Sequence, residues 1–260
     1  MKPNGIITLS TDFGIKDGFV GVMKGIIYGI NPQARIVDIT HHIPPQNIDA
    51  GSFILQNSYK HFPKGTIHVV VVDPGVGSRR RILAVAANNH FFLAPDNQIL
   101  KYIFYKNETL NVAEVLNKRY FSKKISRTFH GRDIFAPVAA HLSKGVPIEN
   151  LGEIITDFDR GRIQWPVLSE NKITGTIIHI DTFGNLISNI EENDLLNRAI
   201  RIRVGKINLN NLSNSYAEVN IGEPLAIFGS SGFLEIAVRN GHAQNHLSLN
   251  IGDRFEIDFT

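Results

Sequence analysis

The chain has 260 residues, of which 43% are hydrophobic and 20% charged, as in an ordinary globular protein. No apolar run approaches the roughly 18 to 20 residues of a membrane helix, and the first predicted strand begins near the amino terminus. We therefore expect a cytoplasmic protein with no membrane partner. The absence of cysteine excludes disulfides, thiol nucleophiles and Cys-ligated zinc. A net charge of +3, without a basic motif or interleaved aromatic residues, does not favour a nucleic-acid partner.

The amino-terminal part of the chain alternates predicted strands and helices. Short apolar runs indicate the strands, and longer segments with apolar side chains at helical spacing indicate the helices. We expect these elements to follow one another as right-handed βαβ units. The first helix also carries a stripe of small residues, Gly21, Gly25 and Gly29, that would permit close packing on the sheet. The predicted elements are residues 6–10, 19–30, 35–40, 48–62 and 69–72.

Two aspartates, Asp12 and Asp17, lie between the first predicted strand and the first helix. Either one could cap the helix by accepting a hydrogen bond from its first turn. The alternative is that a carboxylate at the carboxyl end of a strand binds a ribose diol, as it does in dinucleotide-binding folds. The residues alone leave both interpretations open.

The most hydrophobic short run in the chain is the four valines at residues 69–72, which predict a strand buried on both faces. Asp73 follows at once, then a Pro-Gly turn and three arginines that include Arg80. One tight loop thus delivers a carboxylate and a guanidinium cluster to the edge where open α/β sheets bind ligands. The alternative is an ordinary turn with a capping aspartate and solvated arginines.

Histidine is the remaining candidate for chemistry in this part of the chain. The adjacent His41 and His42 lack the spacing of a metal site, so we interpret them as loop filling and predict no metal. His130 lies near Asp133 and just before a predicted helix at residues 134–142, whose early proline suits a first turn. A lone histidine is either catalytic or structural.

A hairpin, a basic stretch and a change of pattern complete the chain. Residues 82–87 and 90–94 predict a hairpin, because the two asparagines between them tolerate positive φ. Residues 108–115 are ambiguous, and the basic stretch at 118–124 is interpreted as a solvated face.

Beyond a connecting segment we place a domain boundary, which gives domains at 1–165 and 166–260. The second domain is predicted as a small β-barrel or sandwich, with strands at residues 173–180, 199–204, 206–209, 224–228, 234–238 and 254–259.

Six motifs occur in one order along the chain: TLSTDFGIKDGFVGVMKG, VVDPGVGSRR, APDN, TFHGRD, IDTFGN and GSSGFLEIAV. With them the sequence resembles the S-adenosylmethionine (SAM) hydroxide adenosyltransferases, relatives of enzymes that halogenate the same substrate. The resemblance implies an α/β fold, with a Rossmann-like amino-terminal domain on a mostly parallel sheet and a carboxyl-terminal β-barrel. It also implies a homotrimer with sites between one subunit's first domain and a neighbour's second. Two departures are Gln98, where the family tends to have glycine, and His242, where asparagine is usual.

The resemblance further implies an enzyme that hydrolyses SAM to adenosine and L-methionine. In it Asp73, Arg80 and His130 match a triad that holds and polarises the attacking water. No metal or organic cofactor is expected, because a neutral thioether leaves without a Lewis acid. The alternatives are a 5′-halogenase and a non-catalytic protein that binds an adenosyl ligand. The resemblance assigns the ribose hydroxyls to Asp12 assisted by Asp17, the methionine ammonium to Asp181, the adenine edge to Asn185 and the backbone from Arg239 to Ala243, the methionine carboxylate to Ser231, and adenine stacking to Phe183 and Tyr216.

Overall fold

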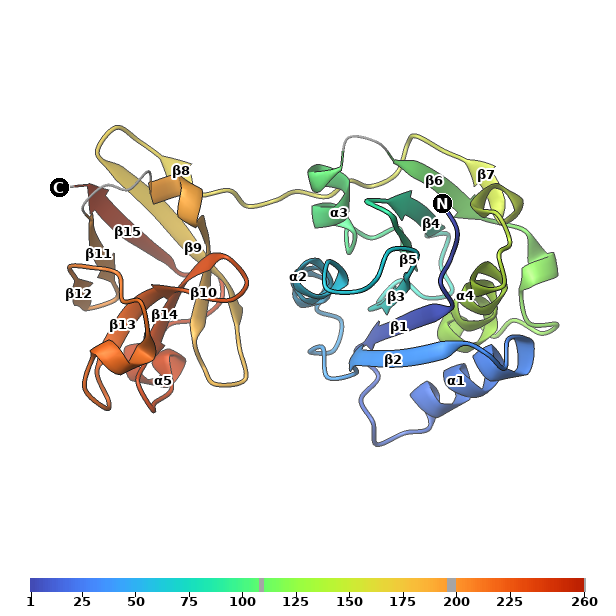
Figure 1. Cartoon of the computed structure of the whole chain (residues 1–260), viewed down its shortest axis with the longest axis horizontal. Coiled ribbons are helices and arrows are strands. Elements are labelled where there is room, and N and C mark those ends of the chain that lie inside the picture. The colour runs from blue at the N-terminus through green and yellow to red at the C-terminus, as the bar shows by residue number, and fades with distance from the viewer. Residues whose placement is uncertain (108–109, 196–199, 260) are drawn as a thin grey trace. The chain divides into compact units, whose positions relative to one another are not determined.

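The computed structural model describes residues 1–107, 110–195 and 200–259. By its internal contacts the chain divides into two compact units, Met1–Ile163 and Gln164–Thr260. Each unit is built around a β-sheet of its own (Figure 1). No helix in the described part of the chain has both the length and the apolar character needed to cross a membrane.

The sheet of the first unit is mixed. Its seven strands are ordered β2-β1-β3-β5-β4-β6-β7. The β2–β1, β1–β3 and β3–β5 pairings are parallel, and the other three are antiparallel because the hairpin β4–β5 reverses the chain. The α/β class is confirmed, with fewer parallel pairings than the sequence predicted. The strands are β1 (Ile6–Thr11), β2 (Arg35–Thr40), β3 (Ile67–Val71), β4 (Ile82–Ala87), β5 (His90–Pro95), β6 (Asn111–Val115) and β7 (Gly152–Ile154).

Helices cover both faces of this sheet (Figure 1). The helices α1 (Phe19–Ile30) and α4 (Ala136–Ser143) pack on one face, and α2 (Ile48–Tyr59) and α3 (Lys101–Lys106) on the other. Alternate residues of β3 serve the two cores, since Val69 contacts the α1 side and Val70 the α2 side. This double burial explains why the valine run is continuous rather than alternating.

Two details of the helices differ from the sequence prediction. Helix α2 ends at Tyr59 rather than at residue 62, because the amides of His61 and Phe62 bond carbonyls three residues back instead of four. Pro63 also disfavours a helical conformation at residue 62. The glycine stripe of α1 does not pack on the sheet, because nothing lies within 4 Å of the position a Cβ would take at Gly21 or Gly25. Met23 and Ile27, both fully buried, form the face that contacts the sheet.

The second unit holds an antiparallel sheet of eight strands, ordered β12-β11-β15-β9-β10-β14-β13 with β8 paired to β9. Its edge strands β12 and β13 contact each other, so the sheet curls into a nearly closed barrel around a core of aliphatic residues (Figure 1). The strands are β8 (Val167–Leu168), β9 (Lys172–Ile180), β10 (Leu186–Glu191), β11 (Ile200–Val204), β12 (Ile207–Leu209), β13 (Pro224–Phe228), β14 (Phe233–Val238) and β15 (Arg254–Phe259); one helix, α5, spans Ala243–Leu247.

Most predicted strands of the second unit lie within two residues of their expected bounds. Strand β10 was not predicted, nor were α3 and the short strands β7 and β8. The predicted starts at Glu108 and Ala199 lie outside the described residues, and from Asn111 the ambiguous segment is the strand β6. Short 3₁₀ turns occur at Lys118–Tyr120, Ile148–Asn150, Glu192–Leu195 and Tyr216–Glu218.

Candidate functional site

A pocket of about 330 Å³ opens at the carboxyl ends of β1 and β3. The chain leaves β1 toward β2 on one side and later returns to β3 on the other side of β1, so the strand order reverses here. Ligands of open α/β sheets bind at such a reversal. Asp12 and Asp73, each two residues or fewer beyond its strand, both line this pocket together with His130.

The pocket places Asp73, Arg80 and His130 in one hydrogen-bonded set. Arg80 Nε donates to both carboxylate oxygens of Asp73 at 2.9 Å, and Arg80 Nη2 donates to Asp73 Oδ2 as well. The same Nη2 donates to His130 Nδ1 at 2.9 Å. The side chains of Asp73 and Arg80 are only 5% and 10% exposed. Asp73 and His130 line the pocket, whereas Arg80 contacts both and is not part of its described lining.

The loop after β3 returns Arg80 to Asp73 through tight turns. The Val76 amide donates to the Asp73 carbonyl at 3.2 Å, and the Ser78 amide to the Gly75 carbonyl at 3.1 Å. Gly77 has φ +79°, and a Cβ there would lie 2.3 Å from the carbonyl oxygen of Arg127. Only glycine fits this position, so the DPGVG sequence is what allows the loop to close on itself.

The tautomer of His130 follows from its partner. A guanidinium has only donors, so His130 Nδ1 must accept from Arg80, and the neutral ring carries its proton on Nε2. Burial and the Arg80 charge both hold the pKa of His130 below its usual value. His130 is therefore a neutral Nε2–H donor near neutral pH.

The segment that carries His130 is anchored by Asp133, which is 2% exposed. Asp133 Oδ2 accepts from the Ser126 amide at 2.7 Å, and Oδ1 accepts from Arg132 Nε at 2.7 Å. A π-helical turn, Gly131–Phe135, precedes α4, because Pro137 has no N–H to bond the Asp133 carbonyl. That carbonyl accepts from the Ser122 amide instead, at 2.9 Å. The helix predicted at residues 134–142 thus begins as a π turn directly after His130.

The two acidic residues near α1 have different surroundings. Asp12 lines the pocket, and its Oδ2 accepts from the backbone amide of Gln46 at 2.8 Å. Asp17 is exposed and lies outside the described lining of the pocket. Neither aspartate caps α1, since its N-cap residue is Gly18 and no side chain bonds the first turn. The capping interpretation is therefore wrong for both.

Three phenylalanines that the sequence did not single out form an apolar wall of this pocket. Phe13, Phe19 and Phe129 meet edge to face, with ring centroids 5.1 to 6.0 Å apart. A Cβ on Gly131 would lie 3.1 Å from Phe13 and from Phe129, so glycine is needed beneath these rings. Two of the three, Phe13 and Phe129, lie inside the STDFG and TFHG motifs, which is the sequence signal that could have found them.

The barrel unit has a pocket of its own, about 600 Å³ in volume. Asp181, Phe183, Asn185 and Tyr216, four residues of the predicted binding set, line it. Asp181 Oδ1 accepts from the backbone amides of Phe183 and Asn185, each at 2.9 Å, and Oδ2 accepts from Asn185 Nδ2 at 3.0 Å. The Phe183 ring is 75% exposed, so it is available to stack on a ligand. Glu235 also lines the pocket and was not predicted.

The other three predicted residues of the barrel lie beside this pocket rather than in its described lining. Ser231 follows Ser230, which does line it. The Arg239 guanidinium donates to the backbone carbonyls of Ala217 and Val219, the latter at 2.6 Å. Ala243 is fully buried in the barrel core at the start of α5, so it can offer a ligand only backbone groups.

His41, one of the adjacent histidines, is buried with protein side chains beside both of its ring nitrogens. It is 4% exposed, its Nδ1 lies 2.8 Å from Thr11 Oγ1, and its Nε2 lies 3.1 Å from Asp38 Oδ1. Across the described residues, no group of three His, Asp or Glu side chains is placed to hold a metal ion. This environment agrees with the loop-filling interpretation of His41.

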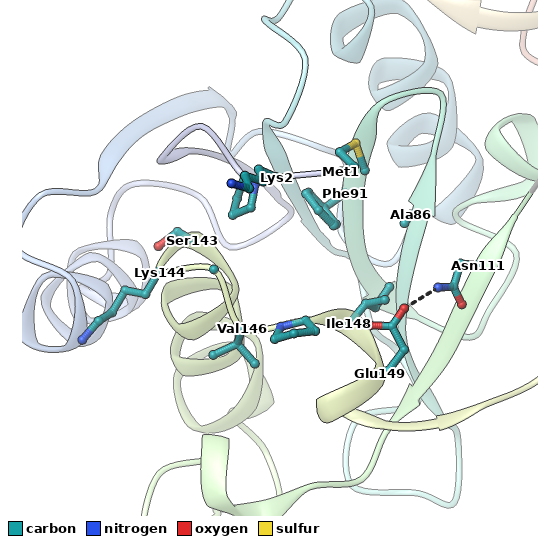
Figure 2. Close-up of a pocket in the computed structure, with 13 residues that line it drawn as sticks. Met1, Lys2, Ala86, Phe91, Asn111, Ser143, Lys144, Val146, Ile148 and Glu149 are labelled. Carbon is teal, nitrogen blue, oxygen red and sulfur yellow. Dashed lines mark hydrogen bonds between the residues drawn. The ribbon is translucent and has the colours of Figure 1, made fainter.

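A further pocket, of about 440 Å³, lies near the amino-terminal ends of β1 and β5 (Figure 2). Figure 2 shows its one carboxylate, Glu149, bonded to Asn111, at 2.9 Å, with Lys144 at the other end of the pocket. None of the predicted site residues lines it. Although this pocket is larger, it contains fewer groups that could take part in a reaction than the pocket of Asp73 and His130.

The chain is similar to known proteins over nearly its whole length. The family model of the SAM hydroxide adenosyltransferase N-terminal domain matches residues 7–152, and that of the C-terminal domain matches residues 175–256. The chain is 35% identical to the (R)-S-adenosyl-L-methionine hydrolase of Methanocaldococcus jannaschii, covering 97% of this chain and 95% of that protein. It is 32% identical to the protein of the same name from Salinispora tropica, covering 99% of each.

A crystal structure of an uncharacterized conserved protein from Thermotoga maritima matches with a TM-score of 0.91 and 39% identity, covering 97% of this chain and 99% of that one. The fluorinase of an Actinoplanes species is more distant, at 26% identity over 90% of this chain and 91% of its own length.

Proposed function

The chain belongs to the family of SAM hydroxide adenosyltransferases, and on that premise we propose that the pocket at β1 and β3 is its active site. The protein is an enzyme that hydrolyses S-adenosyl-L-methionine, giving adenosine and L-methionine. The observation that carries the assignment is the bonded set of Asp73, Arg80 and His130, two members of which line a pocket that also contains Asp12.

In the proposed reaction, a water held by Asp73 and His130 attacks C5′ of the substrate in line with the sulfonium. The new O–C5′ bond forms as the C5′–S bond breaks, and its electron pair stays on sulfur as a neutral thioether. Water has a pKa of about 15.7, so the site must stabilise hydroxide character and accept a proton. His130 Nδ1 is occupied by Arg80 and Nε2 already carries a proton, so His130 donates to the attacking oxygen. Asp73 then takes the proton, and Arg80 holds both side chains in place.

We propose that substrate recognition is divided between the two units. Asp12 takes the ribose hydroxyls, and the wall of Phe13, Phe19 and Phe129 faces the sulfonium, a cation that aromatic faces attract. Asp17 is exposed and would assist only from the rim of the site. The barrel supplies Asp181 and Ser231 to the methionine portion, Asn185 and the backbone from Arg239 to Ala243 to the adenine edge, and Phe183 and Tyr216 to the adenine face.

The fold of the first unit supports the same proposal. We propose that its sheet is a Rossmann-like variant in which the parallel strands β2, β1 and β3 form the nucleotide-binding part. The reversal of strand order between β1 and β3 supports this, because it is the feature that creates a crevice in such sheets.

Hydrolysis is favoured over halogenation by the charge at the reacting centre. A halide nucleophile must be stripped of water, and the buried carboxylate of Asp73 would repel it. A water molecule has no charge to repel and can donate a hydrogen bond to the same carboxylate. A binding protein without activity would have no use for Asp73, Arg80 and His130 as a connected set.

Incubation of the pure protein with SAM should release adenosine and L-methionine, measured by liquid chromatography. In ¹⁸O-water the label should appear in the 5′-hydroxyl of adenosine, because solvent supplies the nucleophile. The rate should be unchanged by chelation with EDTA and should not depend on chloride or fluoride. Formation of a 5′-halo product would show that the protein is a halogenase instead. Recovery of intact SAM would show that it binds the substrate without catalysis.

We also propose that the active unit is a trimer in which one subunit's first unit works with a neighbour's barrel. Two variants, the catalytically impaired Asp73→Asn and the binding-impaired Asp181→Ala, should each be nearly inactive at low SAM concentration and recover activity there when mixed subunits assemble, because some sites combine two intact halves. Sedimentation of the mixture should give a trimer, and turnover should rise well above that of either variant alone. If each chain instead completes its own site, mixed assemblies stay as inactive as their parents.

A further inference from the structure

The barrel pocket contains a buried carboxylate that has no role in the recognition described above. Glu235 lies in β14 between Leu234 and Ile236, which are buried in the barrel core. Because side chains alternate along a strand, Glu235 points to the opposite face of the sheet, where it lines the pocket at 6% exposure. A carboxylate so nearly buried requires partners for its oxygens and its charge.

The two oxygens of Glu235 have different surroundings. Tyr216 donates its hydroxyl proton to Oε1 at 2.6 Å, which fixes the orientation of the carboxylate. A Cβ at position 229 would lie 2.5 Å from Oε2, so Gly229 keeps the space beside this oxygen free of side chain. Within the described part of the chain, no lysine or arginine pairs with Glu235. Oε2 is thus oriented, open to the pocket and without a counter-charge.

A second carboxylate, Asp181, faces the same pocket. Burial raises the pKa of Glu235, the Tyr216 hydroxyl lowers it, and the charge of Asp181 raises it again. Asp181 already accepts three hydrogen bonds from its own loop, so Glu235 has the freer oxygen. A cation between the two carboxylates would relieve both their repulsion and the burial of an unmatched charge.

We propose that Glu235 binds the α-ammonium group of the substrate's amino-acid portion, with Asp181 as the second carboxylate and Tyr216 as the residue that positions Glu235. The proposal rests on the proposed function, because SAM carries an ammonium and a sulfonium against a single carboxylate. Recognition of the ammonium by a fixed pair of carboxylates selects substrates that keep an intact amino-acid portion.

The test compares two substrates on one variant, Glu235→Gln. The first substrate is SAM, and the second is a sulfonium analogue whose amino-acid portion lacks the α-amino group. Loss of a hydrogen bond to a charged group should raise the KM for SAM by about 10- to 100-fold while kcat changes little. The KM for the analogue should stay at its wild-type value, because the analogue has no ammonium to lose. Glu192→Gln, an exposed carboxylate elsewhere in the barrel unit, should change neither KM.

Tyr216→Phe provides a second variant that keeps the carboxylate but releases its orientation. Because phenylalanine keeps the ring assigned to the adenine face and removes only the hydroxyl that bonds Glu235, the variant should raise the KM for SAM by a smaller factor and again spare the analogue. The test therefore does not depend on Glu235→Gln folding well. An equal rise in KM for both substrates would assign Glu235 a merely structural role and overturn the proposal. An unchanged KM for SAM would overturn it too. Failure of the wild-type chain to hydrolyse SAM at all is a different result, which would overturn the proposed function itself.

Discussion

Asp73→Asn is expected to lower kcat for SAM hydrolysis by about 10²- to 10⁴-fold, the usual contribution of general acid–base catalysis. Asparagine has nearly the same shape and can still accept a bond from Arg80, but it carries no charge and cannot take a proton from water. Because Asp12 and the aromatic wall remain, KM should change far less than kcat. Steady-state kinetics measure both, and a thermal unfolding curve checks that the unpaired Arg80 has not unfolded the protein, since breaking a buried ion pair is costly.

Variants of His130 distinguish the proposed mechanism, in which Asp73 accepts the proton, from one in which His130 is the base. His130→Gln keeps an N–H donor and should retain more activity than His130→Ala, for which loss of the donor should cost about 10²- to 10³-fold. If His130 were the base, both variants would be equally inactive. The pH profile gives an independent answer, because burial and Arg80 lower the pKa of His130. The rate should therefore hold to a lower pH than an ordinary histidine would allow, and decline only in more acid solution. His42→Gln, an exposed neighbour of the loop-filling histidine, serves as the control.

The secondary structure around the pocket at β1 and β3 was predictable from the sequence because local pattern and tertiary role agree there. The segments that became α1 and β2 were predicted at the bounds the structure shows, and in α1 the apolar period matches the buried face of Val20, Met23 and Ile27. The return of Arg80 onto Asp73 could not be derived in this way. It depends on the positive φ of Gly77 and its close approach to the Arg127 carbonyl, which is a contact between segments far apart in sequence.

Strand β10 was missed because its interior is polar. Ser188 and Asn189 are polar residues of the kind typical of loops, yet they are 0% and 5% exposed. The side chain of Asn189 makes hydrogen bonds to neighbouring backbone groups. Its Oδ1 accepts from the Thr176 amide, and its Nδ2 donates to the Gln164 carbonyl, each at 2.8 Å. A register shift at Ile187 also breaks the period of two on which strand prediction depends.

The two departures from the family pattern have local structural explanations. Gln98 has φ +76°, a left-handed conformation in which glycine has the least strain, and its side chain compensates by donating to Asp159 Oδ2 at 3.1 Å. His242 accepts from the Asn245 amide at 3.4 Å and so caps α5. Glu235, by contrast, stands out in the sequence as a charged residue inside an apolar strand. Its hydrogen-bond partner and its place in the pocket could be found only from the structure.

Acidification should destabilise the first unit through a histidine that the reaction does not use. His68 is 1% exposed on β3, its Nδ1 lies 2.8 Å from Thr8 Oγ1, and its Nε2 lies 3.2 Å from His90 Nδ1. Burial, with a smaller effect of His90, lowers the pKa of His68 to about 3, so the unfolded chain binds its proton first. Stability should therefore be full above pH 6.5 and fall continuously toward pH 3, by up to about 5 kcal/mol at 1.36 kcal/mol per pKa unit. Urea unfolding measured at several pH values should show this decline, and His68→Phe should flatten it, whereas the exposed control His61→Asn should not. An equally steep decline in His68→Phe would mean that other groups cause the acid sensitivity.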